Sequence, residues 1–144
     1  MRRLYRLLAI EAVERRLLIE SAFLLGVIWL GLGRIPFTTL RRRVVGKPRK
    51  AASSPNRRLA DQAVWAVNTL CDAMPRPPKC LVRALAVQAL LSRRGYPSRL
   101  HIGVMRDSQG GLDGHAWVEG EGRVLIGGSA PELARFAPIT AFDA

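Results

Sequence analysis

The chain has 144 residues, of which 49% are hydrophobic and 24% are charged. This length and composition are typical of one compact globular domain, and they exclude a multidomain enzyme, a disordered chain and a fibrous protein. Two cysteines, Cys71 and Cys80, are too few for a disulfide scaffold, and the formal net charge is +12.

The positive charge is concentrated in the first third of the chain. Residues 1–50 contain twelve Lys and Arg against three Glu, a net charge of +9, whereas residues 101–144 contain three Arg against six acids, a net charge of −3. Such a basic arm favours an anionic partner, although a solvated basic face gives the same pattern. No secretory signal pattern is visible, so we expect a cytoplasmic protein, with membrane association left open.

Apolar residues dominate from Leu4 to Leu32, which predicts one long helix or two short ones. The uncharged run at residues 21–33 has 13 residues and three glycines, and it is shorter than the roughly 18 residues that mark a membrane-spanning helix. Arginine clusters at residues 2–3 and 41–43 flank the segment. Three arrangements are open: packing on the core or docking on a partner protein, which we favour, and a peripheral membrane contact with anionic lipid.

Residues 46–56 are rich in Gly, Pro and Ser, and we expect them to link a basic, apolar helical segment (residues 1–45) to the main domain (residues 57–144). Asn56 suits the N-cap of the helix that follows, because its side-chain oxygen can accept a bond from a first-turn amide. Cys71 lies on the apolar stripe of this helix, and we expect an inert, buried thiol there.

The proline-rich stretch at residues 74–79 cannot be helical, because proline lacks an amide donor and restricts the residue before it. A second helix is predicted from Leu81 to Arg94, ahead of Gly95. Cys80 therefore lies at, or one residue before, a helix N-terminus.

Beyond this helix the apolar residues alternate with a period of two, which predicts three strands. They cover residues 100–105, 115–119 and 123–126, with a glycine-rich turn at residues 108–114 between the first two. Helices followed by a small antiparallel sheet make an α+β fold.

The start of a helix is a favourable place for a reactive cysteine, because unpaired amides and the helix dipole stabilise the thiolate. Lys79 and Arg83 add positive charge near Cys80. His115 heads a strand after the turn and is the better base for the thiol proton, whereas His101 is explained as an ordinary sheet residue. Local chemistry alone gives equal support to two interpretations: Cys80 and His115 form a catalytic pair, or both residues are structural.

Three ordered motifs give a more specific indication. They are CLVRALA at residues 80–86, RRGYPSRLHIGV at residues 93–104 and GHAWVE at residues 114–119. Together they resemble the standalone leader peptidases of lasso peptide biosynthesis, the B proteins, which are cysteine proteases with a papain-like, transglutaminase-like fold. The resemblance runs from about residue 58 to the C-terminus and extends to the basic N-terminal segment that ends in Pro36-Phe37. The broader class of bacterial transglutaminase-like and papain-like folds shares only the order of these two residues, with the cysteine before the histidine.

The resemblance implies a peptidase that removes the leader from a ribosomally made precursor peptide. The freed α-amine of the core peptide would then serve a separate, ATP-dependent macrolactam synthetase. Family members of this length lack a leader-recognition domain, which implies a separate leader-recognition protein. The implied roles are nucleophile for Cys80, general base and acid for His115, and oxyanion donor for the Cys80 backbone amide. No cofactor is implied, and the His and Cys spacings form no recognisable zinc site.

The third catalytic member of that family, an acid on the strand after the histidine, has no counterpart here. If residues 120–122 form a hairpin turn, His115 faces Gly127, or Gly128 after a shift of one residue. Three substitutes remain for orienting the histidine: Glu119 on the same strand face, Asp113 in the preceding turn, or a backbone carbonyl or water. We expect a working dyad whose third member stays open.

Two other functions compete with the leader peptidase. A transglutaminase-like acyltransferase of another pathway would use the same pair of residues. A basic module that binds a membrane or nucleic acid would make the cysteine incidental, but it explains only the charge, and no motif supports nucleic-acid binding. Trp117 is a candidate for lining the substrate groove, although packing beside the strand explains it equally well.

Overall fold

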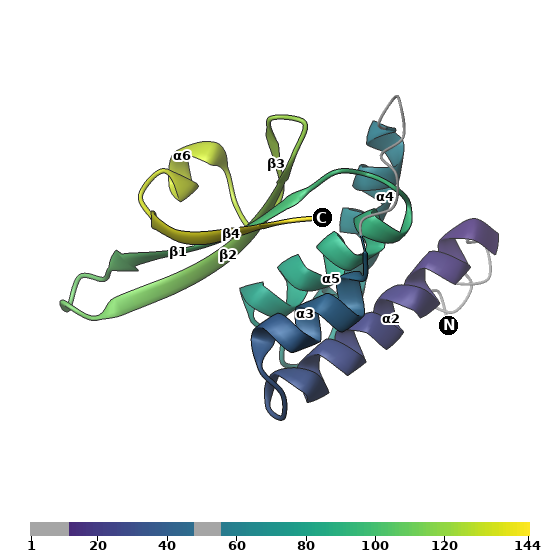
Figure 1. Cartoon of the computed structure of the whole chain (residues 1–144), viewed down its shortest axis with the longest axis horizontal. Coiled ribbons are helices and arrows are strands. Elements are labelled where there is room, and N and C mark those ends of the chain that lie inside the picture. Colours follow the sequence, from purple (N-terminus) through teal and green to yellow (C-terminus); the bar gives the residue numbers. More distant parts are fainter. Residues whose placement is uncertain (1–11, 48–55) are drawn as a thin grey trace.

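The computed structural model describes residues 12–47 and 56–144. It consists of helices followed by a four-stranded antiparallel sheet (Figure 1), which confirms the predicted α+β class. The elements are α2 (Ala12–Leu32), α3 (Phe37–Val45), α4 (Arg57–Ala73), α5 (Cys80–Arg93), β1 (Arg99–Arg106), β2 (Leu112–Gly120), β3 (Arg123–Ile126), α6 (Ala130–Leu133) and β4 (Ala137–Asp143).

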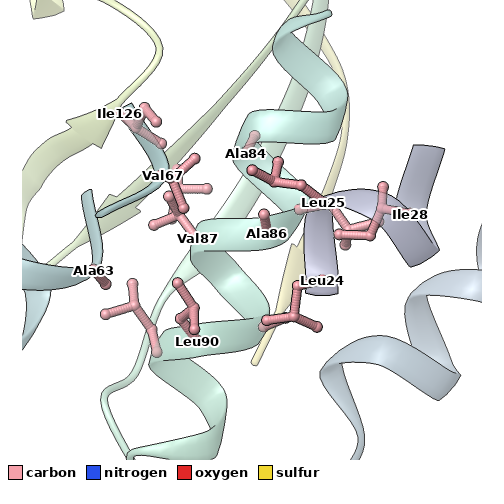
Figure 2. Packing of buried hydrophobic residues seen from close by; sticks show 14 of the residues in the cluster. Leu24, Leu25, Ile28, Ala63, Val67, Ala84, Ala86, Val87, Leu90 and Ile126 are labelled. Carbon is pink, nitrogen blue, oxygen red and sulfur yellow. The ribbon is translucent and has the colours of Figure 1, made fainter. Parts of the chain in front are cut away.

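Helix α5 is the centre of the core. Every residue from Ala84 to Ser92 is buried, because α2, α3 and α4 pack on some of its faces and the sheet packs on another. A helix that is apolar all round is stable only when it is covered on all sides. Figure 2 shows how Leu24, Leu25 and Ile28 of α2 meet the alanines and leucines of α5.

The N-terminal segment contributes to the same core. Residues 12–32 form one helix, and one face of it is buried through Leu17, Leu24, Leu25 and Ile28. Of the arrangements left open, this face of α2 packs on the core. The predicted helix also included residues 4–11 and the predicted linker included residues 48–55, and both ranges lie outside the described residues. Within the described part of the chain, no helix is both long enough and apolar enough to cross a membrane.

A buried amide joins the helices to the last strand. Gln88 of α5 is completely buried; its side chain accepts a hydrogen bond from Arg41 Nε of α3 (3.2 Å) and donates one to the Phe142 carbonyl of β4 (2.8 Å). The Arg41 guanidinium also lies 4.9 Å above the Phe142 ring. Both ends of the Gln88 amide are thus satisfied, as a buried polar group requires, and α3, α5 and β4 are held together.

The helices α4 and α5 begin where the sequence predicts. Asn56 Oδ1 accepts a hydrogen bond from the Arg58 amide (3.0 Å), so the predicted N-cap is confirmed. Helix α5 begins at Cys80, directly after the proline-rich stretch, which confirms the expected position of that cysteine.

The sheet has the order β3-β2-β1-β4. Strand β2 begins at Leu112, three residues earlier than predicted, because Asp107 closes a tighter turn by accepting bonds from the Gln109 and Gly111 amides. Asp113 therefore lies within β2 opposite Met105, and its prediction as a turn residue is wrong. Strand β4 was not predicted, since it is a mostly exposed edge strand that contains Pro138.

The hairpin between β2 and β3 also differs from the prediction. Its turn has two residues, Glu121 and Gly122, both with positive φ, which is the geometry of a tight hairpin. Gly120 therefore pairs with Arg123 and Glu119 with Val124, and a bulge after Val118 shifts the register once more. The three-residue turn expected at residues 120–122 would have paired Glu119 with Arg123, and it is wrong because the turn is one residue shorter.

An ion-pair cluster fastens α2 to the end of α5. Glu20 lies 2.8 Å from Arg94 and 3.4 Å from Arg93. Burial raises the pKa of Glu20, whereas the hydrogen bonds and charges of Arg94 and Arg93 lower it. Together the two arginines outweigh burial, so the pKa lies below its ordinary value of 4.5.

We expect Glu20→Gln to lower the free energy of unfolding by about 1 kcal/mol near neutral pH. A lowered folded-state pKa means that this stabilisation is present above about pH 4.5 and is lost as the pH falls through the folded-state value. Urea unfolding at about pH 7 and about pH 3.5 measures it, with Glu14→Gln on the same helix as the control. An equal difference at the two pH values would contradict the assignment.

Candidate active site

A cavity of about 500 Å³ lies where the N-terminal end of α5 meets β2 and the end of β3. Cys80 and His115 both open onto it, so the fold brings together the two residues predicted from sequence as nucleophile and base. The remaining lining residues come from α4, the proline-rich stretch, α5, strands β2 and β3, and the two glycines after β3: Asn68, Pro78, Arg83, Ala84, Ala116, Leu125, Ile126, Gly127 and Gly128.

Cys80 is the first helical residue of α5, and Lys79 before it has extended backbone angles. The Lys79 carbonyl accepts the first helical bonds, from the amides of Val82 (3.0 Å) and Arg83 (3.3 Å). The Cys80 amide belongs to the first turn, whose N–H groups have no acceptor within the helix. The thiol is half-buried and lies at the positive end of the α5 dipole, which stabilises negative charge on sulfur.

The second cysteine has a different environment. Cys71 is completely buried in α4, and desolvation raises the pKa of its thiol, against a smaller opposing effect of Arg83. A thiol held protonated inside the core is a poor nucleophile. The expectation of a buried Cys71 is confirmed.

His115 packs against two aromatic rings. The Phe136 ring lies 5.1 Å from the imidazole and the Trp117 ring lies 6.2 Å from it, both in stacked arrangements. The imidazole Nε2 contacts the carbonyl oxygen of Gly127. Because a carbonyl only accepts hydrogen bonds, this contact requires a proton on Nε2, and Nδ1 is the nitrogen left to accept a second proton.

The carbonyl of Gly127 is thus the group that orients His115, out of the three substitutes left open by the sequence. Glu119 binds other residues: one of its carboxylate oxygens accepts a hydrogen bond from Trp117 Nε1–H (3.0 Å). The other oxygen lies 3.2 Å from His101 Nε2, close to it but not aligned as a hydrogen bond. The Trp117 ring stands between Glu119 and His115 on the same strand face, which is why the acid does not orient the catalytic candidate. Asp113 is exposed farther along β2.

Gly127 occupies a position that only glycine fits. Its φ is +111°, and a Cβ there would lie 2.5 Å from Trp117 Cβ and 2.9 Å from the Ala116 carbonyl oxygen. Those neighbours are backbone or next to it, so they cannot move aside. An acid cannot stand at this position on this backbone, which runs against Ala116 and Trp117 of β2.

Trp117 does not line the cavity. Its side chain is 5% exposed, and its ring stacks on His101 with centroids 5.3 Å apart as well as on His115. The prediction that it contacts substrate is replaced by a packing role, because Phe136 and His101 cover it.

Sequence reasoning missed one polar lining residue. Asn68 faces the cavity from α4, and its Oδ1 accepts a hydrogen bond from Arg83 Nη1 (3.5 Å). Arg83 also lies 3.7 Å from Asp72. A side-chain amide whose oxygen accepts from Arg83 still has two N–H donors. Asn68 lies on the polar side of an amphipathic helix, twelve residues before Cys80. No sequence motif at that position could reveal that it lines the cavity.

A family model described as the transglutaminase-like superfamily matches residues 22–141. The match includes Cys80, His115 and Gly127, and it reaches from the middle of α2 to β4. No curated protein and no solved structure matches the chain. Across residues 12–47 and 56–144, no three His, Cys, Asp or Glu side chains gather to hold a metal ion.

We expect Gly127→Asp to destabilise the protein by more than about 2 kcal/mol, because the new side chain meets both steric overlap and a positive φ. Thermal or urea unfolding measures the effect. Gly122→Ala is the matched control, since φ is +73° there but a Cβ meets nothing within 4 Å, and it should cost about 1 kcal/mol. Equal destabilisation of the two variants would show that the contact with Trp117 is unimportant.

Proposed function

Because the chain belongs to the transglutaminase-like superfamily, we propose that it is a cysteine peptidase that removes the leader from a ribosomally synthesised lasso peptide precursor. The observation that carries the catalytic part of the proposal is that Cys80, at the start of α5, and His115, on β2, line one cavity. The three ordered motifs around these residues support the narrower substrate class.

The first half of the reaction forms a thioester. His115 Nδ1 takes the proton of the Cys80 thiol, and the thiolate attacks the carbonyl of the scissile peptide bond. The negative charge on the carbonyl oxygen is stabilised by the Cys80 backbone N–H and the Asn68 side-chain N–H. The imidazolium then protonates the leaving amine, so the core peptide departs with a free α-amine and the leader remains bound to sulfur.

The second half is hydrolysis. Neutral His115 takes a proton from water as the water oxygen attacks the thioester, and the proton returns to sulfur as the leader carboxylate leaves. The Gly127 carbonyl accepts the Nε2–H throughout, so the proton transfers use Nδ1. An amine in place of water would give acyl transfer, which is the alternative reaction of the same site.

The size of the cavity supports the dependence on a partner. About 500 Å³ holds only the few residues around a scissile bond, so recognition of a longer leader requires a surface elsewhere. We propose that a separate leader-recognition protein supplies this surface, and that a macrolactam synthetase consumes the free α-amine of the core peptide.

The decisive experiment is mass spectrometry of a precursor peptide incubated with this protein and its leader-recognition partner. We expect a single cut at the leader–core junction, with the mass of one water added to the two fragments. Cys80→Ala and His115→Ala should each slow it by about a thousandfold or more, whereas Cys71→Ala, which alters the buried thiol, should retain it. A cut that persists without Cys80 would refute the proposal, and an amine-adduct product would assign the acyltransferase reaction instead.

Asn68→Ala tests the second oxyanion donor. We expect kcat to fall about a hundredfold with little change in KM, because the donor acts on the transition state. The rate at which iodoacetamide alkylates Cys80 should not change, since alkylation forms no oxyanion. Thr69→Ala, its exposed neighbour on α4, is the control. A fall in alkylation rate together with kcat would mean that Asn68 only supports the fold around the cysteine.

A further inference from the structure

Helix α2 has a second apolar face that no part of the described chain covers. Ile19, Phe23 and Trp29 are 70%, 67% and 67% exposed, and Val27 and Leu30 are exposed beside them. Ile19, Phe23, Val27 and Leu30 recur at helical spacing, so they form one stripe, with Trp29 at its edge. We call these five residues the outer face of α2. Helix α2 lies at the edge of the molecule, on the side of α5 away from the sheet (Figure 1).

Arginines surround the outer face. Exposed Arg15 and Arg16 precede it on α2, Arg34 follows the helix, and exposed Arg42 and Arg43 lie on neighbouring α3. Residues 12–47 contain seven Lys and Arg against two Glu, a net charge of +5. One of these acids, Glu20, is already paired with Arg94 and Arg93. The rim of the outer face is therefore strongly positive.

An apolar groove of about 470 Å³ continues the outer face toward α3. It shares Phe23, Val27 and Leu30 with that face, and Leu24, Gly31, Ile35, Leu40 and Val44 complete its apolar lining. Arg34, Arg43 and Arg93 also line it. An apolar floor with guanidinium groups at its edge matches an acyl chain below an anionic headgroup.

We propose that the outer face of α2 docks the protein on the surface of an anionic lipid bilayer. Helices that lie in the bilayer interface carry apolar and aromatic side chains on the lipid side, with Lys and Arg at headgroup level. The stripe contains no acid and no polar side chain, so it can enter the acyl region while the arginines around it stay at headgroup level. A bilayer also supplies negative charge at both ends of the stripe at once.

The fold restricts this contact to the bilayer surface. The opposite side of α2 is buried against α4 and α5 through Leu17, Leu24, Leu25 and Ile28, so the helix cannot leave the protein to cross the membrane. The candidate active site lies on the far side of α5, where it meets β2. Docking through α2 therefore leaves that cavity open to solution, and the proposal does not depend on the proposed reaction.

Flotation of the full chain with vesicles tests the proposal. We expect at least tenfold more binding to vesicles of phosphatidylcholine with phosphatidylglycerol than to phosphatidylcholine alone, with binding weakened by salt. Phe23→Glu with Leu30→Glu should reduce binding at least tenfold, and Arg42→Glu with Arg43→Glu should remove the preference for anionic vesicles. Leu112→Glu with Ile139→Glu is the matched control, because these residues are 75% and 63% exposed on the sheet.

Trp29 gives a second readout, because its fluorescence should shift to the blue on docking, and the shift should disappear in Trp29→Phe. Circular dichroism of each variant confirms that it is folded. The proposal is overturned if the wild-type protein stays in the vesicle-free fraction, or if Phe23→Glu with Leu30→Glu binds as well as wild type. A dimer that forms through the outer face in sedimentation, without vesicle binding, would assign the face to a second copy of the chain.

Discussion

The structure depends on the burial of α5 from Ala84 to Ser92. Because every residue from Ala84 to Ser92 is covered, the helices and the sheet must pack around this helix, and its axis has little freedom to move. The prolines before it prevent the helix from starting earlier than Cys80. A buried helix with a fixed first residue holds a thiol at the edge of the core, beside a cavity, which an exposed loop could do only with much less precision.

The histidine side of the site is held by packing and by one backbone atom. Phe136 and Trp117 limit the rotation of the His115 ring, and the Gly127 carbonyl selects the nitrogen that carries the proton. A carbonyl carries no net charge, so it orients an imidazolium without stabilising it as a carboxylate does. This arrangement needs a glycine at residue 127, because its carbonyl reaches His115 only when the backbone passes directly against Trp117.

Much of the fold was predictable because its causes are local. Asn56, the proline-rich stretch and the period of the apolar residues placed α4 and α5, and the same reasoning placed Cys80 and His115. The sheet register was not predictable, since a two-residue turn and a bulge after Val118 each shift it by one position. The orienting group was not predictable either, because every residue has a carbonyl and only tertiary structure brings one to the imidazole. Asn68 reaches the cavity through helix packing, which no spacing in the sequence encodes.

Gln88 gives the fold a long-range dependence that reaches across the whole chain. Its amide joins Arg41, near the beginning, to Phe142, near the end, through the middle of α5. Arg41 also donates directly to the Asp143 carbonyl, 102 positions away, so the edge strand β4 is held by these bonds as well as by its neighbour β1. Contacts of such high sequence separation cost more loop-closure entropy than local ones and slow folding. Strand β4 and helices α2 and α3 should consequently fold and unfold together as one cooperative unit, although α5 separates them in the sequence.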